Sequence, residues 1–546
     1  MPGQPFVKNG KTLLSGVDPV LRGEKISGAV TVKDRTLYFC PSPLYGYGLS
    51  RLVTRIQAEA SGSAVLCVEA DPELYELSLK NIDHALLAQK KLHLTNVPAG
   101  AGADWLVSLV RGVWGAMAFR RAETVRFTGG WQLSEALYDS LFEQLRVEIA
   151  NDWSNALTLS KMGRLYIRNA LINLSLLAEF KSVSDLSFGS CNALVLGAGP
   201  SLDETLDAVS CNDTRPYKII CVDTCLGSLK ERGISPDLVI ILESQHWNLR
   251  DFIGCNGWNV AAAVDLCSLP ASAKLLGNDS YIFMTPWTPL KIFFRLKGKN
   301  LLPAEIPPLG SVGLTAVEIA RRLTRGKIIC AGLDFSFTQD KYHARSTPGH
   351  RGSLNRQNRF KRISNSAAFD KNSFAVVSKS GVNAYSSPVM RKYRDLFEQE
   401  FSGDSRIFDI DGTGLPLGIK TLSMKEAIDL LKCNDDEKKV ISRSINDSAP
   451  LCLNVKKHEI ISFFESELKR LQELRDILTG SVCADEKRLY DLLEECDYLW
   501  AHFPDYSGGR AAQTKDVSFL KRVRAELDPM INLIERAHGQ IKNSVS

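Results

Sequence analysis

The chain has 546 residues, with 67 Lys and Arg against 62 Asp and Glu, so its formal net charge is +5. Because positive and negative charges are nearly balanced, the net charge does not by itself indicate nucleic-acid binding, although it allows a local basic pocket for an anionic ligand. Hydrophobic residues make up 44% and charged residues 24% of the chain, as in ordinary globular proteins. The length is that of about three domains.

The 13 cysteines are an odd number, several stand inside apolar runs, and no CxxC pair with zinc spacing occurs. This usage predicts reduced, buried thiols in a reducing compartment. No apolar signal core follows the first residues, and no run of about 18 apolar residues is present. We therefore expect a cytoplasmic protein with no membrane partner.

The first region, residues 1–150, opens like a Rossmann-like α/β domain. Thr36–Cys40 and Ala64–Val68 are expected strands, separated by a Gly- and Pro-rich loop and a helical stretch, and the second is followed by Asp71. A nucleotide or S-adenosylmethionine site and a domain that has kept only the shape both fit this pattern. One loop and one acid are weak evidence for a ligand site, so we favour the second interpretation.

The central region, residues 151–432, alternates short apolar runs with helical segments, which predicts a mostly parallel sheet covered on both faces. Ligands of such sheets bind beyond the carboxyl ends of the strands. Polar residues follow the runs here, among them Ser244 after the third. The expected strands are Ala193–Leu196, Lys218–Val222, Leu238–Leu242, Val260–Val264, Tyr281–Met284 and Lys327–Cys330.

The last region, residues 433–546, is predicted to form a helical domain after a charged linker at residues 434–439. Apolar residues recur every three or four positions from Ile460 to Leu478, which indicates an amphipathic helix. Two further helices are expected near residues 484–500 and 516–541, with a loop at 503–509 between them. Such helices suit the binding of another protein.

The sequence GAGPSL follows the first central strand directly. Its two glycines, Gly197 and Gly199, let the backbone approach a ligand closely, and Pro200 fits a turn into a helix. Ser201 with Glu204 three residues later predicts a capping box. Free N–H groups at such a helix start favour a phosphate, whereas an ordinary strand-to-helix turn is an equal alternative. The run matches neither a dinucleotide fingerprint nor a Walker loop.

A second turn of this kind, with Gly310 and Ser311, precedes the expected helix Leu314–Leu323. Glycines and a serine before a helix suit an anionic or ribose-bearing ligand. By itself the signal is weak, and it gains weight only beside the GAGPSL turn.

A third group of polar residues follows the last expected strand, which ends near Asp334. The next loop contains Tyr342, His343, Arg345 and His350. Histidine exchanges a proton near neutral pH, and Tyr and Arg can stabilise a departing phosphate. For each residue a plain surface position is the alternative. A metal site on the two histidines is less favoured, because no third ligand stands nearby in the sequence.

Together these segments resemble the motility accessory factor family, whose central domain is also described as 6-hydroxymethylpterin diphosphokinase-like. The resemblance covers about residues 190–425. At two positions this chain departs from the family, with Glu243 where Asp or Asn-like residues are frequent and Gly332-Leu-Asp-Phe335 where many members have Gly-Gln-Asp-Leu. The resemblance is carried by GAGPSL, Val222-Asp223, Pro236–Ile240, Gly310–Val312, Gly332–Ser336 with His343, Tyr393-Arg394 and Asp411–Gly414, and more weakly by Gly46–Ser50 and Val68–Asp71.

The resemblance implies an α/β protein with a Rossmann-like central domain of the sialyltransferase type, a GT-A variant. A smaller N-terminal α/β domain and a C-terminal α-helical domain complete it. It implies a glycosyltransferase that moves a nonulosonic acid, a sialic-acid-like sugar such as pseudaminic or legionaminic acid, from a CMP-sugar to Ser or Thr of flagellin. The modification would precede flagellin export and serve motility. The CMP-sugar is the donor substrate. We expect no cofactor, no metal ion and no nucleic acid.

In the mechanism that follows from the resemblance, the N–H groups at Gly199 to Ser201 and the Ser311 turn hold the phosphate and ribose of the donor. Asp223 and Glu243 lie near the cytidine or its ribose. These assignments make the ends of the first three strands the nucleotide side of the site.

The sugar leaves CMP through an oxocarbenium-like transition state, as in glycosidic bond cleavage. Tyr342 and Arg345 are expected to stabilise the phosphate, His343 to take the proton of the acceptor hydroxyl, and His350 to be the second choice for that base. Two other functions stay open: a pterin diphosphokinase that uses ATP, and a non-enzymatic flagellin-binding assembly factor.

Overall fold

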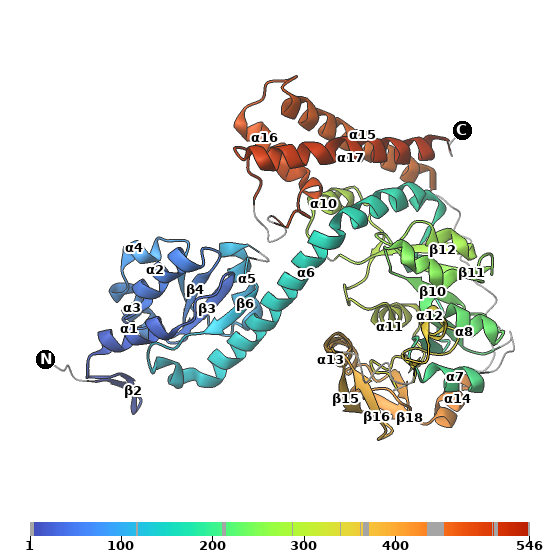
Figure 1. The fold of residues 1–546 in the computed structure, drawn as a ribbon, viewed down its shortest axis with the longest axis horizontal. Coiled ribbons are helices and arrows are strands. Elements are labelled where there is room, and N and C mark those ends of the chain that lie inside the picture. Colours follow the sequence, from blue (N-terminus) through green and yellow to red (C-terminus); the bar gives the residue numbers. More distant parts are fainter. Residues whose placement is uncertain are drawn as a thin grey trace. The chain divides into compact units, whose positions relative to one another are not determined.

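The computed structural model describes residues 5–115, 118–209, 215–286, 288–338, 340–360, 362–363, 371–433, 453–504, 506 and 511–543. They form two compact units, Met1–Arg164 with Glu486–Val523 (unit 1) and Leu165–Asp485 with Arg524–Ser546 (unit 2) (Figure 1). The predicted linker at 434–439 and part of the predicted loop at 503–509 lie outside the described residues. The three predicted domain ranges stay a prediction.

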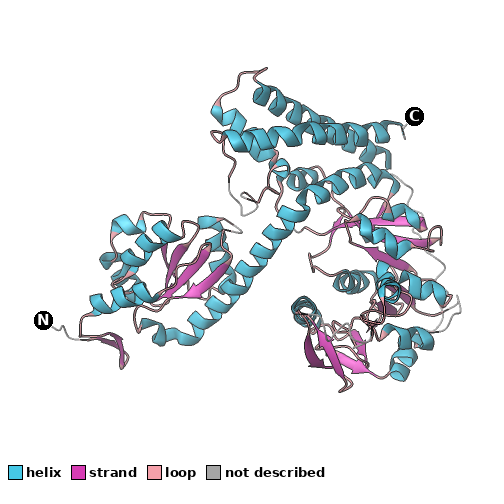
Figure 2. Ribbon diagram, in the orientation of Figure 1, coloured by secondary structure: helices cyan, strands magenta, loops and turns pink. Residues whose placement is uncertain are grey.

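Unit 1 is built on a four-stranded parallel sheet with the order β5-β4-β3-β6. Its middle strands are buried along their whole length, because apolar side chains on both faces are covered by helices (Figure 2). Helices α5 and α6 pack on one face, and α2 and α4 on the other. The strands are β3 (Thr36–Pro41), β4 (Ala64–Glu69), β5 (Leu92–Asn96) and β6 (Arg121–Thr124).

The two strands predicted in this region are therefore confirmed. Helix α3 shows how local sequence sets its start, since Asp71 caps it by accepting from the N–H groups of Glu73 and Leu74, with Pro72 at the first position. The other elements of unit 1 are β1 (Phe6–Lys8), β2 (Lys11–Leu14), α1 (Pro19–Ala29), α2 (Leu49–Glu59), α3 (Pro72–Asn81), α4 (His84–Leu87), α5 (Ala103–Trp114) and α16 (Glu486–Glu495); α6 (Glu135–Leu176) and α17 (Val517–Asn543) contribute to both units.

Unit 2 contains a ten-stranded sheet in which the described strand pairs are all parallel. Its order is β13-β12-β11-β10-β9-β8-β14-β17-β18, with β7 also paired to β12. The strands are β7 (Lys181–Ser182), β8 (Ala193–Leu196), β9 (Lys218–Val222), β10 (Leu238–Ile241), β11 (Val260–Asp265), β12 (Gly277–Met284), β13 (Ala304–Glu305), β14 (Ile328–Ala331), β17 (Ile407–Ile410) and β18 (Lys420–Leu422).

The doubly wound α/β class and all six strands predicted for this region are confirmed, although β12 begins at Gly277 rather than Tyr281. The helices of the sheet domain are α7 (Leu202–Ala208), α8 (Leu226–Glu231), α9 (Ser272–Leu275), α10 (Lys291–Gly298), α11 (Val312–Leu323), α12 (Pro348–Arg356), α13 (Pro388–Phe401) and α14 (Met424–Lys432).

The order of the strands reverses between β8 and β14. From β8 the chain adds β9 to β13 on one side, and it then returns to place β14, β17 and β18 on the other side. The crevice at the carboxyl ends of two strands where the order reverses is the usual ligand site of open parallel sheets. The fold therefore directs attention to the GAGPSL turn after β8 and to Asp334 after β14.

Several strands were not expected from the sequence, among them β17, β18 and the hairpin of β15 (Phe374–Val377) with β16 (Asn383–Ser386). The apolar pattern of β17 is interrupted by Asp409, and β15 is mostly exposed. A polar residue inside a short strand such as β17 weakens the apolar signal, and a run of four apolar residues such as β15 is too short to distinguish a strand from part of a helix.

The predicted C-terminal helices are present as α15 (Leu453–Thr479), α16 and α17. Glu467 of α15 is 1% exposed and ties this helix to the sheet domain. Both of its carboxylate oxygens accept from Arg295 of α10, at 2.8 and 2.9 Å, and one also accepts from Arg470 at 2.6 Å. Helix α15 is thus part of the core of unit 2.

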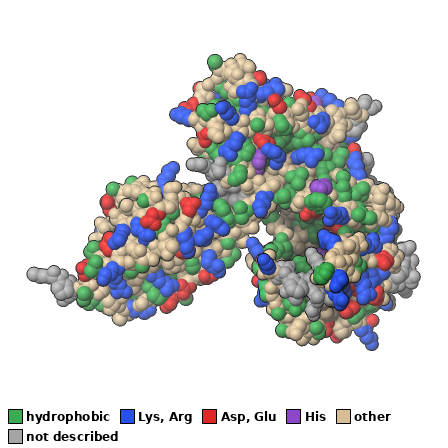
Figure 3. All heavy atoms as spheres, viewed as in Figure 1, with side chains coloured by type: hydrophobic (Ala, Val, Ile, Leu, Met, Phe, Trp, Pro, Cys, Tyr) green, Lys and Arg blue, Asp and Glu red, His purple; other side chains and the backbone are tan. Residues whose placement is uncertain are grey.

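Among the described residues, no helix is both long and apolar enough to cross a membrane. The eleven described cysteines are free, and most are buried, as predicted. On the face drawn in Figure 3, Lys and Arg side chains are interspersed with Asp and Glu over the surface, in keeping with the even charge balance.

We predict that Glu467→Ala lowers the free energy of unfolding of unit 2 by about 3 kcal/mol, because it leaves two partly buried arginines without their carboxylate. The measurement is calorimetric unfolding of the full chain. The matched control is Lys297→Ala, which removes an exposed ion pair with Glu305 and should change stability by less than about 1 kcal/mol. Equal losses in the two variants would contradict this view of the α15 contact.

Candidate functional site

The carboxyl ends of β8 and β14 pack backbone against backbone. The N–H groups of Gly197 and Gly199 donate to the carbonyls of Ala331 and Gly332, each at 2.8 Å. A Cβ on Gly197 would lie 2.5 Å from the Gly332 carbonyl oxygen, and Gly332 itself has a φ of +67°. Only glycine allows this approach, so the glycines of GAGPSL serve the join between two strands.

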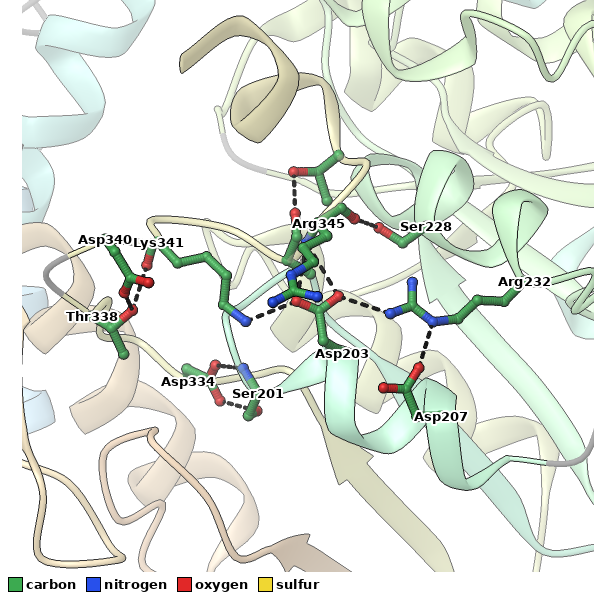
Figure 4. Close-up of polar contacts among 12 residues, drawn as sticks. Ser201, Asp203, Asp207, Ser228, Arg232, Asp334, Thr338, Asp340, Lys341 and Arg345 are labelled. Carbon is green, nitrogen blue, oxygen red and sulfur yellow. Dashed lines mark hydrogen bonds and ion pairs between the residues drawn. The ribbon is translucent and has the colours of Figure 1, made fainter. Parts of the chain in front are cut away.

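Asp334 fills the space between these strand ends. Its side chain is buried; one carboxylate oxygen accepts from the Ser201 N–H at 2.7 Å and the other from the Ser201 hydroxyl at 2.5 Å (Figure 4). A Cβ on Gly199 would come within 2.5 Å of this carboxylate, and one on Gly414 within 2.8 Å of it. Burial raises the pKa of Asp334, while the two bonds from Ser201 act in the opposite direction.

Two details predicted for the GAGPSL turn are therefore wrong. Ser201 makes no capping bond to α7, because its hydroxyl is bound to Asp334 instead. The N–H groups of Gly199 and Ser201 are not free to hold a phosphate, since each already donates to a group from the end of β14. The carboxylate of Asp334, which follows β14, occupies the place predicted for the phosphate.

The second predicted turn does begin an open helix N-terminus. Gly310 has a φ of +69°, and no side chain caps α11 after Ser311. A Cβ on Gly313 would lie 2.6 Å from the Leu333 side chain, which is also the neighbour of Gly197. The first turn of α11 therefore starts beside the ends of β8 and β14, where its N–H groups and dipole favour an anion.

The loop after β14 is fixed on α7 by Asp203, a side chain with 9% exposure (Figure 4). Asp203 accepts from Lys341 Nζ at 2.8 Å, from the Arg345 backbone N–H at 3.2 Å and from Arg232 at 3.3 Å. The Ser228 hydroxyl donates to the Arg345 carbonyl. Burial raises the pKa of Asp203, but these donors outweigh it and keep the pKa below its usual range.

The loop places His343 against the GAGPSL turn. The His343 ring packs against Gly349 and bonds to the Ala198 backbone, and burial lowers its pKa. His350 stands in the first turn of α12, where burial also lowers its pKa. Both rings are therefore mostly neutral at pH 7, the form in which histidine accepts a proton.

The other two loop residues face outward. The Tyr342 ring stacks at 4.3 Å on Phe337 and lies 5.1 Å from the His343 ring, with the Tyr342 side chain 39% exposed. Arg345 is exposed, and its backbone is held by Asp203 and Ser228. Within the described part of the chain, no group of three or more His, Cys, Asp or Glu side chains is arranged to hold a metal ion.

Asp223 and Glu243 belong to a neighbouring cluster at the ends of β9 and β10. Asp223 is buried and accepts from Asn248 at 2.7 Å and from the Thr224 N–H at 2.9 Å. Burial raises its pKa to about 6. Glu243 is exposed and accepts from the Gln245 N–H at 2.9 Å. The structure thus brings Ser201, Asp334 and His343 together. Asp223 and Glu243 form a second group along the same edge of the sheet.

Sequence reasoning missed the charged residues that hold the site in place. Asp203 and Lys341 stand next to predicted segments but carry no pairing signal. Lys379, in the turn of the β15–β16 hairpin, is buried and lies 2.5 Å from Asp409 at the end of β17; its backbone N–H donates to Gly414. A pair so distant in sequence has no local signature.

In unit 1 the corresponding strand ends are filled by the chain itself. Glu69 is fully buried and accepts from Ser78 at 3.2 Å, and burial raises its pKa to about 7. Asp71 caps α3 and pairs with Lys8 at 2.5 Å. A Cβ on Gly23 of α1 would lie 2.5 Å from the Tyr47 carbonyl oxygen of the glycine loop. This packing favours the interpretation that unit 1 kept the shape and not the ligand.

Comparison with known proteins agrees with this fold. Residues 168–340 match the family model described as 6-hydroxymethylpterin diphosphokinase MptE-like. That range includes β8 to β14, the GAGPSL turn, α11 and Asp334. The centre of the chain is therefore an α/β domain similar to the MptE-like family.

One protein sequence and one solved structure are similar over nearly the whole chain. An uncharacterized protein of Treponema pallidum (strain Nichols) is 27% identical over 540 residues, which are 94% of this chain and 90% of the relative. A solved structure, a MAf glycosyltransferase from Magnetospirillum magneticum AMB-1, aligns over 99% of this chain and 85% of its own, with a TM-score of 0.50 and 14% identity. The chain is Maf-like in fold, as the resemblance implied.

We predict that Gly199→Ala destabilises unit 2 by about 1–3 kcal/mol, because the new methyl group overlaps the Asp334 carboxylate. The measurement is thermal unfolding of the full chain. As control, Gly298→Ala adds a methyl group at the end of α10 with no atom within 4 Å, so stability should be unchanged or slightly raised. An unchanged Tm for Gly199→Ala would refute the close join of the two strand ends.

Proposed function

We propose that the chain is a glycosyltransferase with a CMP-activated nonulosonic acid as donor and Ser or Thr hydroxyls of flagellin as acceptors. One observation carries the proposal: the uncapped N-terminus of α11 opens beside the Asp334–Ser201 join, where the strand order reverses. This is where an open parallel sheet binds a nucleotide phosphate.

The phosphate of the donor would lie on the first turn of α11, after Ser311. This placement replaces the turn of Gly199 to Ser201, whose N–H groups are already bound. Asp334 and Ser201 would then act as positioning residues that keep the edge of the pocket rigid. The helix dipole and the exposed Arg345 guanidinium would stabilise the negative charge that grows on CMP as the sugar leaves.

His343 would take the proton of the acceptor hydroxyl. Its ring rests on the backbone of the GAGPSL turn, and burial keeps it in the neutral, proton-accepting form. Tyr342 lies against the same ring and would line the side on which the acceptor enters. No cofactor beyond the CMP-sugar enters this scheme, which would operate in the cytoplasm before flagellin is exported.

The comparisons support a group-transfer enzyme, since one match is described as a diphosphokinase and the other as a glycosyltransferase. The diphosphokinase description also makes a pterin diphosphokinase that uses ATP and Mg²⁺ the second candidate. A non-enzymatic flagellin-binding factor is a third candidate, and the helices α15 and α17 would suit it.

Ligand-induced stabilisation separates the three candidates. We predict that millimolar CMP and CMP-sialic acid raise the Tm of the purified chain and that Mg-ATP does not. Saturation to 100 times the dissociation constant stabilises the folded state by about 2.7 kcal/mol. A shift with Mg-ATP alone would favour the kinase, and no shift with any of the three ligands would favour the binding factor.

We predict that His343→Ala lowers kcat for sugar transfer to flagellin by 10²–10⁴-fold, the usual contribution of a general base. Because the base must be deprotonated and burial lowers its pKa, wild-type kcat should fall on an acid limb that lies below the ordinary pKa of histidine. The variant should lack this acid limb. His458→Ala, an exposed histidine of α15, is the matched control and should keep both the rate and the pH profile. An unchanged profile in His343→Ala would exclude His343 as the base.

A further inference from the structure

The nearly even charge of the whole chain conceals one strongly basic segment. Residues 341–394 contain twelve Lys and Arg residues and one acidic residue, Asp370, which gives a formal charge of +11. The whole chain carries +5, so the other residues together carry −6. The segment connects β14 to β17 and includes the His343 loop, α12, the β15–β16 hairpin and the first part of α13. We call it the basic segment.

Some of these cations are used inside the fold, and others face solvent. Lys341 pairs with Asp203 and Lys379 with Asp409. Arg351 is exposed and makes a long ion pair of 3.8 Å with Glu231. A concentration of exposed positive charge favours an anionic partner. The exposed members of the basic segment include Arg345, Arg351, Arg356, Arg359, Arg362 and Lys371.

Exposed apolar side chains are interleaved with these charges. Phe360 is 86% exposed, with the Arg359 guanidinium 4.9 Å above its ring, and Leu354 of α12 is 44% exposed. None of the nine residues of α12 is fully buried, although a helix this short depends on packing for its stability. Arginine and aromatic side chains that share one surface are typical of interfaces with a macromolecule. A small anion would leave the apolar side chains uncovered.

Strand β15 of the same segment has an open edge. Tyr385 of β16 exchanges two backbone hydrogen bonds of 2.8 Å with Phe337, and it lies directly opposite Ala375 of β15. In an antiparallel pair, the backbone groups of two such residues point away from each other. The N–H and C=O of Ala375, and those of Val377 two residues later, therefore point to the other edge. Within the described residues, β15 pairs with β16 alone.

The basic segment is continuous with the proposed active site. The Phe337 ring lies 4.3 Å from the Tyr342 ring and 6.1 Å from the Tyr385 ring, so it joins the His343 loop to the hairpin. Gly349 of α12 packs against the His343 ring. A partner held on the hairpin and α12 would therefore lie beside the proposed base.

We infer that the basic segment binds an extended, acidic polypeptide, which adds a strand to the open edge of β15 and places its carboxylates against the exposed arginines. Charge complementarity selects an acidic partner, and a polypeptide supplies the alternating N–H and C=O groups that a strand edge requires. A lipid surface or a nucleic acid would match the charge alone. The inference rests on the proposed function where it identifies this polypeptide with the acceptor segment that contains the Ser or Thr.

The test measures by fluorescence anisotropy how the full chain binds a dye-labelled peptide of about ten residues, in which Glu alternates with Val and Thr. Wild type should bind this Glu peptide at least about tenfold more tightly than the same peptide with Lys in place of Glu, and added salt should weaken the binding. Equal affinity for the two peptides, or no binding of either, would overturn the inference.

Two pairs of variants separate the charge from the strand pairing. Arg356→Ala combined with Arg359→Ala should weaken binding of the Glu peptide about fivefold. Its control, Arg524→Ala combined with Arg536→Ala, removes two exposed arginines of α17 and should bind as wild type does. Ala375→Pro removes an outward N–H and should also weaken binding about fivefold, whereas Ala375→Val keeps the N–H and should retain the affinity.

The arginine variants change exposed side chains, so they decide the matter even where Ala375→Pro does not fold. Wild-type affinity in the double variant of Arg356 and Arg359 would overturn the inference, and wild-type affinity in a folded Ala375→Pro would overturn the added strand. Vesicles that contain phosphatidylserine are the remaining probe. Binding of these vesicles without binding of the Glu peptide would overturn the inference in favour of a membrane surface.

The peptide measurement needs no sugar donor, which separates this inference from the proposed function. Peptide binding with the expected losses, but no sugar transfer to flagellin, would overturn the CMP-sugar proposal and support the docking surface. Sugar transfer at the wild-type KM for flagellin in the double variant of Arg356 and Arg359 would do the reverse.

Discussion

The site depends on one buried carboxylate. Asp334 receives both the N–H and the hydroxyl of Ser201, and so joins the turn after β8 to the end of β14. The contact requires glycine at positions 197, 199, 332 and 414, since a side chain at any of them would overlap the facing strand or Asp334 itself. The GAGPSL run therefore serves first to join β8 to β14 at the point where the strand order reverses.

The other buried acids at this edge have separate partners. Asp203 holds Lys341 and the backbone of Arg345, and Asp409 holds Lys379. Because these cations are committed to carboxylates, the proposed mechanism relies instead on the open end of α11 and on the exposed Arg345.

The similarity to known proteins includes the same strand ends. The MptE-like match spans the strands on either side of the reversal point, while the Maf structure shares the fold over nearly the whole chain at only 14% identity. Backbone packing at the glycines tolerates few substitutions, whereas helix faces and loops tolerate many. The strand ends are therefore a part of the fold that packing constrains tightly.

The sequence by itself determined the six central strands, the helical end of the chain and the order of the polar residues along the sheet edge, because apolar periodicity and glycine turns are local signals. It did not determine that Asp334 occupies the predicted phosphate cradle, because that bond joins residues 133 positions apart. The ion pairs Lys379–Asp409 and Asp203–Lys341 escaped prediction for the same reason. Polar partners that meet only after the strands align leave no local pattern, so the tertiary structure alone decided which helix N-terminus stays open.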